Sequence, residues 1–155
     1  MKKGIWILAL AVLFALSAPG FSTPFKVYPG ARLEGVYETK QPEAPGKMAA
    51  AVKVKRITFT TYDPFETVVA FYRTLAKEYR TPGGGGNPVR LPSGQELKEA
   101  YFILDGARDL STSEHWIKIQ RPYIDRDQTG GASYGKYEQA KEVTAIIEEE
   151  KGSYP

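Results

Sequence analysis

The sequence predicts an α+β fold, with one main amphipathic helix at about residues 64–80 packed on an antiparallel sheet of four to six strands. Apolar residues recur at helical spacing in that one stretch, and short β-branched runs bounded by Gly and Pro occur on both sides of it. The chain has 155 residues, of which 42% are hydrophobic and 25% charged, a composition typical of one globular domain. We therefore expect a single domain over residues 23–155.

The first 22 residues have the layout of a secretory signal peptide. Met1-Lys2-Lys3 is positively charged, and Ile5 to Leu16 is an unbroken run of 12 apolar residues. A membrane-spanning helix needs about 20 apolar residues, so cleavage between Ser17 and Ser22 is expected rather than an uncleaved anchor. The sequence thus predicts a periplasmic or secreted protein without a stable membrane span after cleavage.

The first strands are expected on either side of a proline-rich loop. Ala31 to Thr39 follows a Pro-Gly turn and predicts a short edge strand with a bulge at Gly35. Ala51 to Tyr62 is dense in β-branched residues and predicts a longer strand. Its apolar residues change parity near Lys55-Arg56, which predicts a phase slip there.

The helix has the strongest local signal. Asp63, Pro64 and Glu66 stand where a capping box places its acceptor, its first helical residue and its N3 carboxylate. The apolar residues at helical spacing are Phe65, Val68, Val69, Tyr72, Leu75, Ala76 and Tyr79. Such a stripe is typical of a face packed on the core, so we do not assign it a ligand.

The second half of the chain predicts further strands separated by turns. Residues 81–88 contain four consecutive glycines and lack the Gly-Lys-Ser/Thr ending of a phosphate loop, so a surface connection is expected. Val89 to Leu91 and Tyr101 to Leu104 predict one short and one buried strand. Glu96 to Glu99 could instead begin a helix. His115 to Arg121 alternates and ends at a proline, which predicts a strand.

The last element is ambiguous between strand and helix over residues 142–150. Val143 to Ile147 is rich in β-formers, whereas the residues around it are good helix formers. We favour a strand, because His115 to Arg121 needs a pairing partner. The acidic run Glu148 to Glu150 is interpreted as a solvated end.

Two segments resemble uncharacterised exported bacterial proteins. The first is Tyr28-Pro29-Gly30-Ala31, and the second is Thr60 to Tyr72, with the Asp-Pro-Phe helix start followed by Val-Val-Ala-Phe-Tyr. The resemblance covers about the first half of the domain and implies a small α+β fold. It supplies no activity and no site residue.

Composition excludes several chemistries. There is no cysteine and only one histidine, so disulfides, thiolate metal sites and a histidine-rich metal centre are absent from this sequence. The formal net charge of +3 includes Lys2 and Lys3 of the leader, and the basic residues are dispersed, which argues against a nucleic-acid partner. No cofactor motif occurs, and none is predicted.

His115, with Glu114 and Asp109 near it in sequence, is the one place for a conventional general base. No Gly-x-Ser-x-Gly elbow or other serine motif accompanies it. An envelope hydrolase with a site near His115 is therefore kept as an alternative, and no residue is assigned as catalytic.

Asp125, Asp127 and Thr129 occupy the first, third and fifth positions of an EF-hand-like calcium loop, with Gly130 at the sixth. Lys136 stands at the twelfth position, where a bidentate glutamate belongs. We expect a polar loop that binds no metal, and keep a calcium-stabilised loop as a second alternative.

Tyrosine is abundant, with ten in the chain. Tyr123, Tyr134 and Tyr137 lie in or beside the predicted long loop and suit either a contact surface for a protein or glycan or the rim of a small core. The sequence therefore favours an exported binding or structural module of the bacterial cell envelope, whose partner would be an envelope protein or a glycan.

Overall fold

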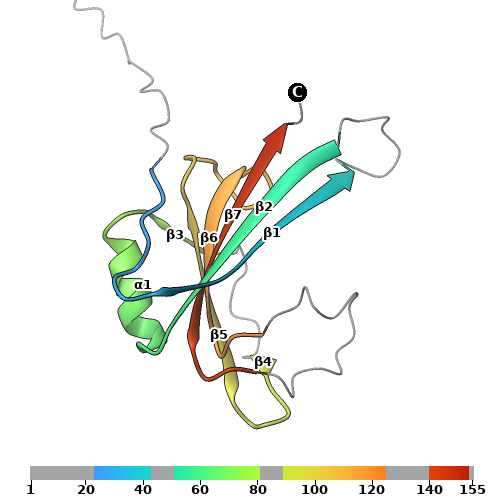
Figure 1. Cartoon of the computed structure of the whole chain (residues 1–155). Helices are drawn as coiled ribbons and strands as arrows, with labels where there is room; N and C mark the ends of the chain where they lie inside the picture. The colour runs from blue at the N-terminus through green and yellow to red at the C-terminus, as the bar shows by residue number, and fades with distance from the viewer. Residues whose placement is uncertain (1–22, 43–50, 81–88, 125–139, 154–155) are drawn as a thin grey trace, which may run out of the picture.

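The computed structural model describes residues 23–42, 51–80, 89–124 and 140–153. Within these residues the chain forms one helix and a sheet of seven antiparallel strands, with the order β1-β2-β7-β6-β5-β3 and β4 beside β5 (Figure 1). The α+β expectation holds in coarse form. The sheet is larger than the predicted four to six strands, and the helix is the smaller part of the fold.

The strand bounds are as follows: β1 Arg32–Pro42, β2 Ala51–Thr61, β3 Glu78–Tyr79, β4 Val89–Arg90, β5 Glu96–Ile103, β6 His115–Arg121 and β7 Thr144–Ser153. β1 is an edge strand, and its register with β2 shifts between Leu33 and Gly35, which confirms the predicted bulge. β6 has the predicted bounds. β7 confirms the strand interpretation of residues 142–150, and β5 excludes the helix considered at Glu96 to Glu99.

The predicted phase slip in β2 is wrong. Its register with β7 runs without interruption from Val52 to Thr61. Apolar residues occur at both parities because both faces of this strand are covered. Val54 is 4% exposed on one face, and Phe59 packs against the main core on the other.

Helix α1 spans Phe65–Arg73, shorter than the predicted 64–80. The chain leaves the helix after Thr74, whose hydroxyl donates to the Phe71 carbonyl oxygen at 2.7 Å. Residues 78–79 then pair with β5 as an added strand, and Arg73 and Glu78 form an ion pair at 2.7 Å. Pairing with the sheet edge therefore replaces the last two turns of the expected helix.

The helix start also differs from the predicted capping box. The N-cap residue is Pro64, and no side chain in the described part of the chain caps the helix. The Asp63 carboxylate instead accepts a hydrogen bond of 2.6 Å from the Tyr28 hydroxyl. The Asp63 carbonyl oxygen accepts from Thr144 Oγ1 at 2.7 Å and from Arg121 Nη1 at 3.1 Å, so backbone anchoring to β7 and β6 fixes the helix start.

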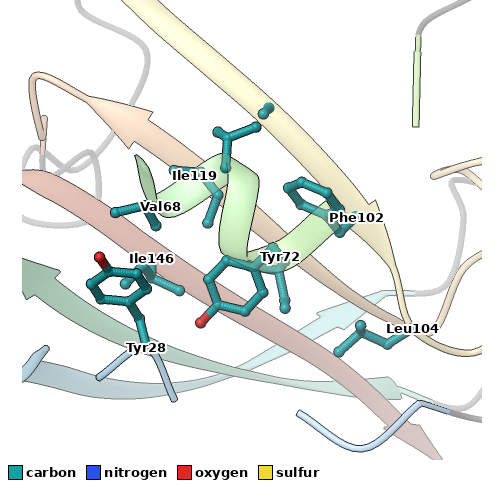
Figure 2. Packing of buried hydrophobic residues seen from close by; sticks show 10 residues of the cluster. Tyr28, Val68, Tyr72, Phe102, Leu104, Ile119 and Ile146 are labelled. Carbon is teal, nitrogen blue, oxygen red and sulfur yellow. The ribbon is translucent and has the colours of Figure 1, made fainter. Parts of the chain in front are cut away.

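The main core lies between α1 and one face of the sheet. Figure 2 shows Tyr72 of the helix between Tyr28 and Phe102, in the cluster that also contains Ile146 of β7. Tyr72 is completely buried, and its hydroxyl donates to the Lys26 carbonyl oxygen at 3.0 Å. Burial, reinforced by the negative charge of Glu148, raises the pKa of Tyr72 well above its ordinary value. The helix thus covers one face of the sheet. The apolar clusters away from the helix are formed by residues from the second half of the chain.

Among the residues described, no helix is long and apolar enough to span a bilayer.

Candidate functional site

The candidate site lies on the sheet face opposite α1. Side chains on this face come from alternate residues of four neighbouring strands, and cross-strand pairing sets them in rows. One row aligns Arg56, Glu149 and Trp116 across β2, β7 and β6. The next row aligns Thr58, Ile147, Lys118 and Tyr101 across β2, β7, β6 and β5.

These rows line a cavity of about 160 Å³. We call it the sheet-face cavity. It is bounded by Arg56, Thr58, Tyr101, Trp116, Lys118, Gln120, Tyr123, Ile124, Ile147 and Glu149. Tyr123 and Ile124 follow β6 after Pro122, and the backbone of Tyr123 pairs with that of Lys141. Among the strand residues at the cavity, Thr58 and Gln120 are buried although polar, at 2% and 1% exposure.

Gln120 carries the most informative feature of the cavity. Its side-chain nitrogen Nε2 is buried, and none of the described residues provides it with a hydrogen-bond partner. A buried donor without a partner costs about 1–3 kcal/mol, which is a large part of the stability of an ordinary domain. No other buried side-chain N or O atom of the described residues lacks a partner.

Two ion pairs lie along the cavity. Arg56 donates from Nε and Nη2 to Glu149 Oε2 at 3.2 and 3.0 Å. Lys118 Nζ lies 2.5 Å from Glu99 Oε1, and the same ammonium stands 5.7 Å from the centre of the Tyr101 ring. Tyr101 in turn lies beside Trp116, with ring centroids 6.1 Å apart. The site therefore combines aromatic rings, paired charges and one unsatisfied amide.

Glu148 and Glu149 correct the interpretation of the acidic run as a solvated end. Both lie within β7 and are 8% exposed. They point to opposite faces, as neighbours in a strand must. Glu149 reaches Arg56 on the cavity side, and Glu148 Oε1 lies 2.9 Å from His115 Nε2 on the helix side.

His115, the predicted place for a general base, is therefore away from the sheet-face cavity. Its imidazole bonds Glu148, whereas the Ser113 hydroxyl lies within hydrogen-bond distance of two acceptors, Asp105 Oδ1 at 3.0 Å and the His115 carbonyl oxygen at 3.1 Å. Glu114 and Asp109 are not brought to the ring: Asp109 closes a turn by accepting from Ser111 and Thr112. In the described structure no serine hydroxyl bonds the His115 ring.

Asp105 organises the approach to β6. Burial opposes ionisation of this carboxyl, but the backbone N–H groups of Glu114, Ala107 and His115 and the Ser113 hydroxyl donate to it. These donors outweigh the burial and lower the pKa of Asp105 below its ordinary value. The role of Asp105 is structural, since it holds the turn before the strand.

A second cavity of about 280 Å³ lies at the start of the helix, between Glu66, Lys98 and Arg121. Its polar groups have partners here: Lys98 Nζ lies 2.5 Å from Glu66 Oε1, and Arg121 donates to the Tyr62 and Asp63 carbonyl oxygens. The Lys98 and Glu66 side chains are 44% and 67% exposed. We therefore regard this cavity as a solvated surface depression and the sheet-face cavity as the candidate site.

Several predicted site residues lie outside the described residues. These are the calcium-loop residues Asp125, Asp127, Thr129 and Lys136, the tyrosines Tyr134 and Tyr137, and the leader. Tyr123 is described, is 3% exposed and lines the cavity. Among the described residues, no group of three or more His, Asp or Glu side chains is arranged to hold a metal ion.

Sequence reasoning did not identify Gln120, Thr58 or the Arg56–Glu149 pair. A signal was available in the apolar residues on the same face of each strand. Val54 on β2 and Ile147 on β7 are buried, and Trp116 on β6 lines the cavity, whereas a fully solvated face would not bury such residues. Comparison of the chain with protein-family models, curated proteins and solved structures finds no match.

Proposed function

We propose that this chain is an exported binding module of the bacterial envelope and that the sheet-face cavity is its ligand site. The observation that carries the proposal is the buried, unpartnered Nε2 of Gln120 in a cavity lined by aromatic and charged side chains. A donor held without a partner is pre-organised for an acceptor that arrives with a ligand. The leader-like segment supports the export part of the proposal.

A binding amide and a structural amide have opposite effects on stability. If Gln120 is held for a ligand, replacing it by an apolar side chain of similar shape removes a desolvation cost from the ligand-free protein. If the amide is structural and satisfied by ordered water, the same replacement removes favourable hydrogen bonds. The sign of the change in unfolding free energy therefore distinguishes the two roles without knowledge of the ligand.

The test is urea unfolding of ligand-free Gln120→Met, with Gln120→Leu as a second apolar variant. We expect both to be more stable than the wild type, by about 1 kcal/mol for Met. The matched control is Gln95→Met, because Gln95 is exposed and bonds Glu142 at the surface. Protein is taken from the exported fraction, where intact mass should show loss of roughly 17 to 22 residues. Destabilisation in both Gln120 variants, or a full-length mass, would count against the proposal.

A further inference from the structure

We infer that the ligand of the sheet-face cavity is an uncharged sugar residue of a glycan, and more narrowly one that carries an acetamido group. The inference rests on the proposed function, since it names the ligand class of that same site. Four properties of the cavity lead to it: charge balance, hydrogen-bonding capacity, aromatic surface and size.

Charge balance favours an uncharged ligand. Arg56 faces Glu149 at 3.0 Å, and Lys118 faces Glu99 at 2.5 Å, so each cation of the site has its own carboxylate. An anionic ligand would have to compete with these carboxylates, and a cationic ligand with the two cations. A neutral ligand leaves both ion pairs in place and avoids the cost of exposing a half-buried charge without its partner.

Hydrogen-bonding capacity favours a ligand that carries both acceptors and donors. Gln120 Nε2 requires an acceptor, and the Glu149 carboxylate beside the cavity accepts only. A sugar hydroxyl serves either kind of group because it donates and accepts. An acetamido carbonyl oxygen matches the Gln120 amide in particular, and its methyl group suits the apolar side chain of Ile147, which is 9% exposed.

The aromatic lining favours a ring with an apolar face. Trp116 and Tyr101 are inclined at 49° with centroids 6.1 Å apart, and both border the cavity. Sugar rings present C–H groups on one face and hydroxyls at the edge, which is the division between aromatic rings and polar groups found here.

Size limits the ligand to a small group. The volume of about 160 Å³ is below the roughly 300–1,000 Å³ of pockets that enclose drug-sized ligands. One sugar ring or its substituent fits this space, and the rest of a glycan chain would lie outside it. A bulky folded partner is not accommodated within the cavity.

The experiment uses tryptophan fluorescence of the exported protein. The sequence contains two tryptophans, Trp6 and Trp116, so Trp6→Phe makes Trp116 the sole reporter whether or not the leader is removed. The probes are three trisaccharides. Two are uncharged, the trimers of N-acetylglucosamine and of glucose, and one is anionic, the trimer of galacturonic acid. We expect saturable binding of the first, weaker binding of the second and none of the third.

Two cavity variants and two matched controls locate the site. Gln120→Met should weaken binding of the N-acetylglucosamine trimer about tenfold, as expected for loss of one buried hydrogen bond. Thr58→Val should weaken it as well, whereas Thr60→Val, on the same strand and face but outside the cavity lining, should not. Gln95→Met is the control for Gln120→Met. Because the ligand is uncharged, the dissociation constant should change by less than about twofold between low and high salt.

Three results would overturn the inference. They are the absence of a saturable change with either uncharged trimer up to about 10 mM, binding of the galacturonic acid trimer that weakens with salt, and binding that the two cavity variants leave unchanged. The unfolding experiment on ligand-free Gln120→Met is independent of all three. If Gln120→Met is more stable but no sugar binds, the sugar is the wrong ligand class and the proposed ligand site stands. If Gln120→Met is less stable, the proposed ligand site itself is wrong.

Discussion

The hydrogen bond between Tyr28 and Asp63 joins the segment before β1 to the start of the helix. The two oxygen atoms lie 2.6 Å apart, and Tyr28 is 8% exposed. A bond to a charged acceptor contributes about 1.5–3 kcal/mol when buried, but Asp63 is exposed and we expect about 1 kcal/mol. The same bond, helped by burial, raises the pKa of Tyr28.

A double-mutant cycle separates this bond from the capping role that the sequence suggested for Asp63. Tyr28→Phe keeps the ring and its edge-on contact with Phe71, so it should cost about 1 kcal/mol through the lost bond alone. Asp63→Ala should cost more, because it also removes a negative charge near the helix N-terminus, worth about 0.3–1 kcal/mol. In the double variant the bond is lost once, which gives a coupling energy of about 1 kcal/mol.

The measurement is the urea midpoint and slope for the four proteins at neutral pH, followed by circular dichroism. Tyr62→Phe is the control, since Tyr62 is 81% exposed and should change the unfolding free energy by less than about 0.5 kcal/mol. If Asp63 capped the helix, its substitution and that of Tyr28 would affect separate interactions. Additive costs within about 0.3 kcal/mol would therefore refute the bond and restore the capping box.

Two further predictions concern pH. Because burial raises the pKa of Tyr72 in the folded state, stability should be retained below about pH 10 and fall as pH rises further. Tyr72→Phe should make the decrease of the unfolding free energy with pH less steep, by up to the contribution of one proton, about 1.4 kcal/mol per pH unit. The measurement is urea unfolding at several pH values from 8 to 11. The folded-state pKa of Asp105 is lowered, so its contribution is present above its ordinary pKa of about 4 and is lost as pH falls through the folded value. Asp105→Asn should therefore have a lower urea midpoint at pH 7 and approach the wild type near pH 2, and a constant difference at all pH values would contradict this assignment.

The strands could be predicted from sequence because their signals are local. β6 has the predicted bounds, and the bulge at Gly35 was indicated by the glycine within the apolar alternation of β1. The end of the helix could not be predicted in this way. Residues 74–80 continue the apolar stripe, but Glu78 and Tyr79 gain backbone hydrogen bonds from β5, a strand about twenty residues further along the chain. Pairing over such distances leaves no periodic signal at the helix terminus.

The capping box failed for a related reason. Asp63, Pro64 and Glu66 have the spacing of that motif, yet the Asp63 carboxylate bonds a tyrosine that stands 35 positions earlier. The Asp63 carboxylate accepts from Tyr28 and makes no capping hydrogen bond to the helix. The backbone of Asp63 is already held by Thr144 and Arg121, so the helix start does not depend on the side chain, which is then available to Tyr28.

The candidate site was hidden because strand alternation assigns polar residues to solvent. Strand alternation places Thr58, Gln120 and Glu149 on one face of the sheet. In a sheet covered on one side only, such polar residues are predicted to be exposed to solvent. In the fold this face is partly covered by small apolar clusters that include Tyr123 with Ala145 and Ile147, and Ile124 with Leu97. Because these clusters cover part of the second face, polar side chains on it are partly buried. Each of their polar groups then needs a hydrogen-bond partner, either within the protein or from a ligand. Among the described residues, Gln120 is the one with a buried side-chain donor that lacks a partner. Binding should therefore be sought on the face opposite the helix rather than at the lone histidine or the aspartates of the loop.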